Sequence, residues 1–412
     1  MKRISLLLLT LALLQNSLSA QQFDPQKDYT KGYLNTITTA VPFLMIAPDS
    51  RSGSLGDIGV ATSADATSQQ HNPSKYVFNK NVFGISFSYS PWLSKLVNDV
   101  NLLYMAGYYR ISKMDAIGFS LRYFGLGEIT FTNDWGHIMG TQKPNEFAID
   151  FTYSRKLIDV LSIAITPRFI YSDLTAGQNV GQMDSYPGLA GAADLSLFYE
   201  QDFKLPNSSI HNSTLRFGLN ISNMGNKIKY SNSTDQRDFI PTNLKLGLGY
   251  TLEFDEYNSF ALSFELNKLL VPTKPIYSRD TLLPNNEAGR IIALGKDPNV
   301  SVPQGMIQSF YDAPGGFKEE MREINFGVGL EYAYRDLLFV RMGYFYENKW
   351  KGGRQYLTFG AGIKYSIIGI DMAYLFTTTR NHHPLENTLR FTLTFDLVSF
   401  DGEDIKNQRK LK

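Results

Sequence analysis

Apolar and polar residues alternate in fourteen short segments of the chain, separated by connections of unequal length. Alternation with a period of two is typical of a β-strand with one apolar and one polar face. So many strands of this kind predict an all-β fold, a fourteen-stranded antiparallel transmembrane β-barrel. The predicted strands are Asn81–Ser90, Val100–Ile111, Ala116–Phe124, Glu146–Ser154, Ser162–Ser172, Ala192–Tyr199, Leu215–Asn223, Asn243–Leu252, Ser259–Asn267, Glu323–Tyr334, Leu337–Glu347, Gln355–Tyr365, Ile367–Phe376 and Thr388–Val398.

Charged residues within these segments support the interpretation. In most segments the bulky apolar residues define the outward face, and the charged residues then fall on the alternate positions, which face inward. The second segment is ambiguous, and there the charged residue is used to assign the inward face. An Arg or Lys that faces lipid near the midplane costs about 2–4 kcal/mol. We therefore expect the lumen to be lined by Arg110, Arg122, Asp150, Arg168, Asp194, Arg216, Lys245, Glu265, Glu331, Arg341, Lys364, Asp371, Arg390 and Asp396.

Long and short connections alternate, as in bacterial outer-membrane barrels, where the long loops face outward. With a periplasmic N-terminus, the predicted outer connections include Gly125–Asn145, Asp173–Gly191, Met224–Thr242 and Lys268–Arg322. The periplasmic connection Glu200–Thr214 is longer than the pattern prefers. Residues 268–322 form the longest connection and contain several prolines, which is typical of functional or mobile loops. We favour an ordered outer cap or partner surface, and a disordered insertion is the alternative.

The N-terminal part of the chain differs from the rest. Residues 1–20 have the basic start, apolar run and small C-terminal residues of a signal peptide. We expect a flexible segment over 21–39 and a hatch over 40–78, which is rich in Gly, Ala, Ser and Asp. The barrel would then occupy 79–400, and a polar tail 401–412.

Composition narrows the class of protein. The mean hydropathy of −0.20 is too polar for a bundle of membrane helices, whereas 24 Tyr and 28 Phe suit the aromatic girdles of a barrel. The formal net charge of +1 gives no reason to expect nucleic acid as a partner. The chain contains no cysteine, which excludes a disulfide framework and a thiol nucleophile.

The predicted barrel size calls for a plug. Side chains alone fill a lumen of about eight strands, and sixteen to eighteen strands leave an aqueous channel. Fourteen strands lie between these cases, and residues 40–78 are available to fill the space. The nearly balanced charges of the lumen favour ion pairs with such a plug over an ion-selective pore.

The search for chemistry yields few candidates. We predict no catalytic residue, no cofactor and no metal site; His382 and His383 are adjacent in a loop and lack further ligands at suitable spacing. Candidate hatch residues are Gly53, Gly56 and Asp57, where glycine permits tight turns, and Asn72 with Pro73. Trp92, Trp135 and Trp350 lie in predicted outer loops, where they would anchor the membrane interface or contact a partner.

The hatch also carries a resemblance. Residues 40–61, AVPFLMIAPDSRSGSLGDIGVA, and the following TSADATSQQHNPSKY resemble the start of the PorV (LptO) family, within the broader FadL-like outer-membrane barrels. Asn72-Pro73-Ser74 departs mildly from the Asn-Pro-Ala-like turn of those barrels. The resemblance implies a fourteen-stranded barrel with an N-terminal hatch in the lumen.

The resemblance further implies a role in the type IX secretion system of Bacteroidota. Proteins of this family bind the C-terminal signal domain of cargo emerging from the translocon barrel (SprA/Sov-like). They deliver it to the attachment complex, where a PorU-like sortase acts. The alternative is a FadL-like channel for long-chain fatty acids or other hydrophobic small molecules, which predicts an apolar pocket beneath the outer loops; a structural scaffold is a third possibility.

Overall fold

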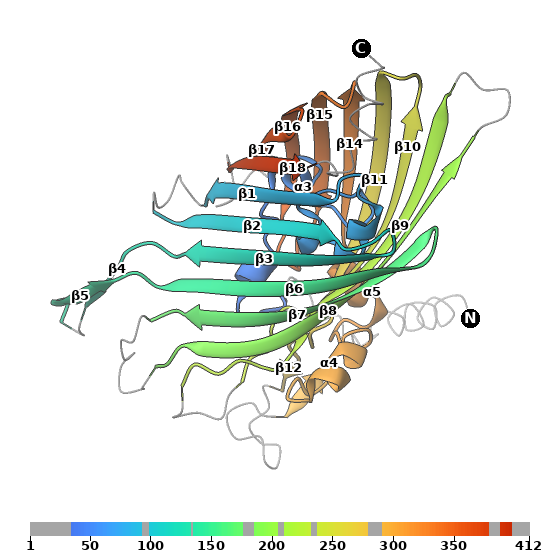
Figure 1. Ribbon diagram of the computed structural model, residues 1–412. Coiled ribbons are helices and arrows are strands. Elements are labelled where there is room, and N and C mark those ends of the chain that lie inside the picture. Colours follow the sequence, from blue (N-terminus) through green and yellow to red (C-terminus); the bar gives the residue numbers. More distant parts are fainter. Residues whose placement is uncertain are drawn as a thin grey trace, which may run out of the picture.

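The computed structural model describes residues 34–92, 99–132, 135–175, 185–204, 210–231, 237–278, 291–378 and 388–397. Within these ranges, no helix has the length and apolar character needed to cross a membrane. Strands dominate the fold, and short helices occur at the N-terminal side and in one long connection (Figure 1).

The main sheet is a closed antiparallel barrel of fourteen strands, which confirms the predicted fold class. Each strand pairs with its neighbour along the chain, and the first strand closes the barrel by pairing with the last. The barrel strands are β1 (Phe83–Pro91), β2 (Asn101–Arg110), β3 (Asp115–Gly125), β6 (Asn145–Ile158), β7 (Leu161–Asp173), β8 (Gly188–Phe203), β9 (Asn212–Gly225), β10 (Asn243–Glu253), β11 (Asn258–Leu269), β14 (Asn325–Tyr334), β15 (Leu338–Tyr346), β16 (Gln355–Tyr365), β17 (Ile368–Thr377) and β18 (Leu389–Leu397).

Burial alternates along the strands as the sequence pattern predicts. In β1, for example, Ser86 and Ser88 are buried while Phe87 and Tyr89 are exposed. None of the fourteen predicted lumen charges belongs to the exposed class. The outer wall is therefore apolar and aromatic, as a lipid-facing surface requires.

The two ends of the barrel differ in the length of their connections. We call the end that carries residues 126–144, 226–242 and 270–324 the long-loop end. The opposite, short-turn end carries connections such as 111–114, 335–337 and 366–367. Strand β1 runs from the short-turn end to the long-loop end.

The hatch occupies the lumen and consists of η1 (Pro42–Met45), α3 (Ser50–Ser54), η2 (Ser68–Gln70) and η3 (Pro73–Phe78). Ala40 donates its N–H to Phe239 in a long-loop connection, and Arg110 near the short-turn end donates to the carbonyl of Asn79. The hatch thus crosses the barrel from the long-loop end to the start of β1. Figure 1 shows it inside the strands.

The described residues before the predicted hatch also contact the barrel. Asn35 is 4% exposed and donates its backbone N–H to the carbonyl of Trp350 at 3.1 Å. Its side chain donates to Lys274 and Glu319. The described part of the segment predicted to be flexible, residues 34–39, is therefore attached to the long-loop end, opposite the start of β1. The predicted periplasmic N-terminus fits the start of β1 but not these residues.

Two further differences concern the connections. The connection Glu200–Thr214 is shorter than predicted, because β8 continues to Phe203 and β9 begins at Asn212, and these strand ends pair with each other. The outer connections contain small elements that the sequence pattern did not predict: the hairpin β4 (Ile129–Thr132) and β5 (Ile138–Gln142), the pair β12 (Ile276–Tyr277) and β13 (Ile292–Leu294), and α4 (Val302–Gln308), α5 (Phe317–Glu320) and η4 (Met321–Glu323).

Candidate functional site

The glycines of the predicted hatch site lie where the hatch touches the barrel wall. A Cβ at Gly53 would overlap the side chain of Arg390. Gly56 has a φ of 79°, and a Cβ there would lie 2.8 Å from the carbonyl oxygen of Tyr344. Gly56 requires glycine because it combines a positive φ with close approach to the wall backbone, whereas a side chain at Gly53 would have to displace Arg390.

Asp57 and Asn72 fix the hatch through their side chains. The Asp57 carboxylate accepts hydrogen bonds from Arg390 and from the hydroxyl of Tyr356. The Asn72 amide donates to the carbonyls of Val60 at 2.9 Å and Leu197 at 3.0 Å, and its oxygen caps η3. Pro73 follows as the first residue of η3, where a missing N–H costs nothing.

Charged side chains of β11 and β14 also hold the hatch. Arg51 forms ion pairs with Asp65 of the hatch at 2.7 Å and with Glu331 of β14 at 2.9 Å. Glu265 of β11 accepts the backbone N–H groups of two hatch residues, both at 2.8 Å. Some lumen charges therefore pair with the plug, as predicted, whereas others pair within the wall, as Arg168 does with Asp150 and Asp194.

An apolar cluster fills the lumen near the long-loop end. Phe43 and Leu44 of the hatch pack with inward-facing residues of the wall and with Ile228 and Ile240 of a long connection. The ring of Phe43 stacks on Phe124 with centroids 6.2 Å apart. This is the region where an uptake channel would need an apolar ligand pocket, and side chains occupy it.

Two small hollows lie beside the hatch. Each has a volume of about 10 Å³, and their lining includes Asp49, Arg51, His71 and Lys75 in one and Arg216 in the other. That volume suits a single water molecule. Neither hollow could admit a fatty acid.

The long connection 270–324 forms a structured cap on the barrel, so far as it is described. Lys268, at the end of β11, contacts Glu323 at 2.7 Å and Glu320 at 3.1 Å. Lys351, in the connection after β15, contacts Glu319 at 2.5 Å and Glu323 at 2.9 Å. Burial alone would raise the pKa of Glu323, but the two lysines hold the pKa below its usual range. The cap is therefore attached to the barrel by buried charge.

The cap exposes several apolar side chains. Five of them come from α4, α5 and the turns beside them, with exposed fractions of 47% to 79%: Ile307, Phe310, Tyr311, Phe317 and Met321. We call this set the cap patch. Large apolar side chains that are exposed outside the lipid-facing wall are typical of interaction sites when they adjoin one another. Figure 1 shows α4 and α5 together beyond the strand ends.

The three tryptophans do not form one surface. Trp92 packs against the apolar cluster of the lumen. Trp135, beside the β4–β5 hairpin, is 81% exposed, and Trp350 lies at the attachment of the N-terminal segment. Of the three, only Trp135 presents most of its side chain for contact.

Sequence reasoning missed the cap patch. Its only signal is the cluster of aromatic residues Phe310, Tyr311 and Phe317 in a loop otherwise rich in Pro and Gly. Among the described residues, no group of three or more His, Cys, Asp or Glu could hold a metal ion. His382 and His383 lie outside the described residues.

Several solved barrels are similar to this chain. A Pseudomonas aeruginosa FadL homologue is 13% identical, with a TM-score of 0.39, over 88% of this chain and 99% of that one. The Pseudomonas putida toluene transporter TodX is 11% identical, with a TM-score of 0.44, over 88% of this chain and 98% of that one. BamA from Haemophilus ducreyi, without POTRA domains 1–3, is 9% identical, with a TM-score of 0.33, over 84% of this chain and 76% of that one.

The sequence is informative about the family. No curated protein matches the chain significantly. The model of the family described as "Type IX secretion system protein PorV" matches residues 29–276, which is more than half of the chain. The matched region contains the hatch and the strands from β1 to β11. Together with the closed fourteen-stranded barrel, this match shows that the chain belongs to the PorV family of type IX secretion system proteins and is an integral outer-membrane β-barrel.

Proposed function

We propose that the protein is an outer-membrane shuttle of type IX secretion. It binds the C-terminal signal domain of a cargo protein as the cargo leaves the SprA/Sov-like translocon barrel. It then delivers the cargo to the attachment complex that contains a PorU-like sortase. The capture is non-covalent and takes place on the long-loop end, which we assign to the cell surface.

The cap patch is the observation that carries this proposal. Phe310 and Tyr311 are 50% and 55% exposed, and Phe317 is 79% exposed. Aromatic side chains of this kind supply much of the binding energy in protein interfaces. Lys296 lies 3.8 Å from the ring of Tyr311, which adds a basic group beside the patch.

The filled lumen gives less support to the alternative of a FadL-like channel. Phe43 and Leu44 are 1% and 3% exposed in the place where a hydrophobic ligand would enter. A channel would require these side chains and the cap to move apart.

The test is binding of an isolated cargo signal domain to the purified protein. We expect Phe310→Ser combined with Tyr311→Ser to weaken binding by roughly thirtyfold, the effect of losing about 2 kcal/mol at a hot spot. Phe254→Ser is the matched control, because Phe254 is 46% exposed but lies at the short-turn end. In cells, the double variant should accumulate uncleaved cargo.

Two outcomes would contradict the proposal. One is unchanged binding and cargo cleavage in the folded double variant. The other is loss of fatty-acid uptake with normal secretion when the protein is deleted, which would support the channel. Trp135→Ser in the same assays tests separately whether the β4–β5 hairpin belongs to the surface.

A further inference from the structure

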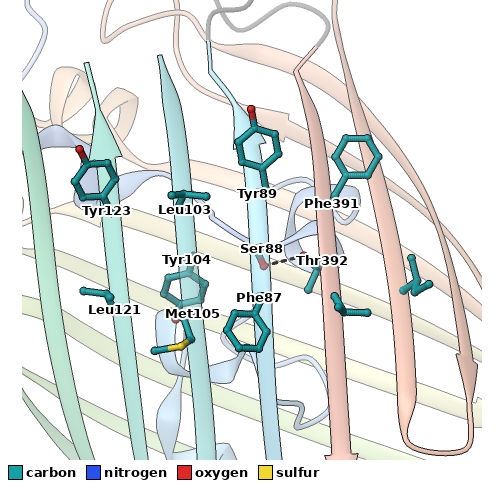
Figure 2. A pocket seen from close by; sticks show the side chains of 12 residues that line it. Phe87, Ser88, Tyr89, Leu103, Tyr104, Met105, Leu121, Tyr123, Phe391 and Thr392 are labelled. Carbon is teal, nitrogen blue, oxygen red and sulfur yellow. Dashed lines mark hydrogen bonds between the residues drawn. The ribbon is translucent and has the colours of Figure 1, made fainter. Parts of the chain in front are cut away.

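A large hollow lies on the outer wall where the barrel closes. Its volume is about 520 Å³, and strands β1, β2, β3, β17 and β18 line it. Figure 2 shows Phe87 and Tyr89 of β1 beside Leu103 of β2, Tyr123 of β3 and Phe391 of β18. These five side chains are 38% to 46% exposed. They belong to the outward parity of their strands, so the hollow faces lipid and not the lumen.

The lining of the hollow is mainly apolar. None of its lining residues carries a charge, and its polar atoms are hydroxyl groups and backbone. Ser88 and Thr392 belong to the inward parity, and their hydroxyls hydrogen-bond each other at 2.8 Å on the lumen side of the β1–β18 seam, where Thr392 also accepts the N–H of Ser50. An ionic group placed in such an environment would lose its hydration without compensation. A ligand would therefore insert an apolar chain and leave any headgroup outside.

The hollow lies at a defined level along the strands, and so along the membrane normal. Its residues on β1, β2, β3 and β18 lie at or beyond the middle of their strands toward the long-loop end. In the orientation assigned above, that half of the wall faces the outer leaflet. The tyrosine hydroxyls of Tyr89 and Tyr123 point toward the long-loop end in Figure 2, where an interface with polar headgroups would lie.

We propose that this hollow, the seam pocket, binds the hydrocarbon chain of an outer-leaflet membrane lipid. Continuity with the lipid-facing wall supports a lipid as occupant, since acyl chains already cover the surrounding surface. The concave shape lets a chain contact β1, β2 and β18 at once, so it buries more apolar area than on a flat wall. Because the chain is already in hydrocarbon, the gain comes from van der Waals contacts, which are more numerous here than on a flat wall, and such a chain exchanges more slowly than its neighbours.

The test compares lipid retention by matched variants purified from the outer membrane in mild detergent. Leu103→Trp fills the seam pocket, and Leu262→Trp places the same ring on β11 across the barrel. Leu103 and Leu262 are both 45% exposed. By native mass spectrometry, we expect about one retained lipid per chain for the unaltered protein and for Leu262→Trp. Leu103→Trp should retain roughly tenfold less, because the indole ring occupies the space of the lipid chain.

A second variant and a second measurement distinguish loss of the pocket from misfolding of a variant. Leu393→Trp fills the pocket from β18, and heat-modifiable gel mobility verifies that each barrel is folded. Added phosphatidylethanolamine with a diazirine in its acyl chain should label β1, β2 and β18 in the unaltered protein and in Leu262→Trp only. The proposal would be overturned if all variants retained lipid equally, or if no lipid or only a free fatty acid were retained. Labelling of other strands in place of β1, β2 and β18 would also overturn it.

Discussion

Arg51 shows how single residues couple the hatch to the wall. Its guanidinium is 15% exposed and contacts carboxylates on both sides, Asp65 in the hatch and Glu331 in β14. Arg341 also binds Glu331, at 2.5 Å. Removing one member of such a buried network leaves uncompensated charge, which costs more than the pair itself contributes.

We therefore expect Arg51→Ala to lower the free energy of unfolding by about 3–5 kcal/mol. Urea titration of the barrel in detergent, followed by gel mobility, measures the change. Arg155→Ala is the control, because Arg155 is 54% exposed in its pair with Asp115, and water screens that pair. Similar midpoints for the two variants would contradict a structural role for the Arg51 network.

Asp312 should make the cap sensitive to pH. Its carboxylate accepts the N–H of Thr273 at 3.1 Å, while burial, with Glu320 and Glu323 nearby, raises the pKa to about 7. Because the pKa is raised on folding, this residue stabilises the cap fully below the unfolded pKa of 3.8. The stabilisation is lost as pH rises toward 7.

Asp312→Asn keeps a hydrogen-bonding side chain and removes the charge. We expect the cap of this variant to gain protection from hydrogen exchange at pH 7 relative to the unaltered protein. The difference should disappear near pH 4. A difference that grows at low pH would show the opposite sign of linkage.

At the scale of elements, the backbone path of the hatch depends on Gly56. The residue combines a positive φ with close approach to the wall, and these two requirements can be separated. Gly136 has nearly the same φ, 80°, but a Cβ there would meet no atom within 4 Å. It therefore serves as a control for the backbone cost alone.

We expect Gly56→Ala to destabilise the barrel by about 1–3 kcal/mol more than Gly136→Ala, since only the first must also displace the wall. Protease resistance of the hatch and urea unfolding both measure this. Equal effects of the two substitutions would mean that φ, and not the contact with Tyr344, makes Gly56 necessary.

The barrel strands were predictable because their signal is local. Alternating residues such as those of β18, Leu389–Leu397, report the two faces of a strand without knowledge of its neighbours. The cap helices α4 and α5 were missed because they are short and lie among Pro and Gly. The contacts of Asp57 with Arg390 were not predictable, since they depend on how residues far apart in the chain meet in the lumen.

At the scale of the whole molecule, the position of the N-terminal segment tests the orientation of the barrel in the membrane. Leu34 is 60% exposed beside Asn35, whose contacts lie at the long-loop end. We expect Leu34→Cys to react with a membrane-impermeant maleimide on intact cells. The absence of native cysteine makes the labelling specific. Lys113→Cys, at the short-turn end, should react only after the outer membrane is permeabilised. The reverse result would contradict the assigned orientation.

The pairing of β1 with β18 has a consequence for the order of assembly. Ser50 and Asp57 of the hatch contact Thr392 and Arg390, so partners more than 300 residues apart must meet before the lumen is complete. Contacts at such sequence separation form late, because a long loop must first close. The hatch is synthesised first, but its contacts with β18 can form only after that last strand has joined the barrel. A chain that lost β18 would lack the wall partners Thr392 and Arg390 of the hatch, and would present unpaired strand edges to any other barrel being folded nearby.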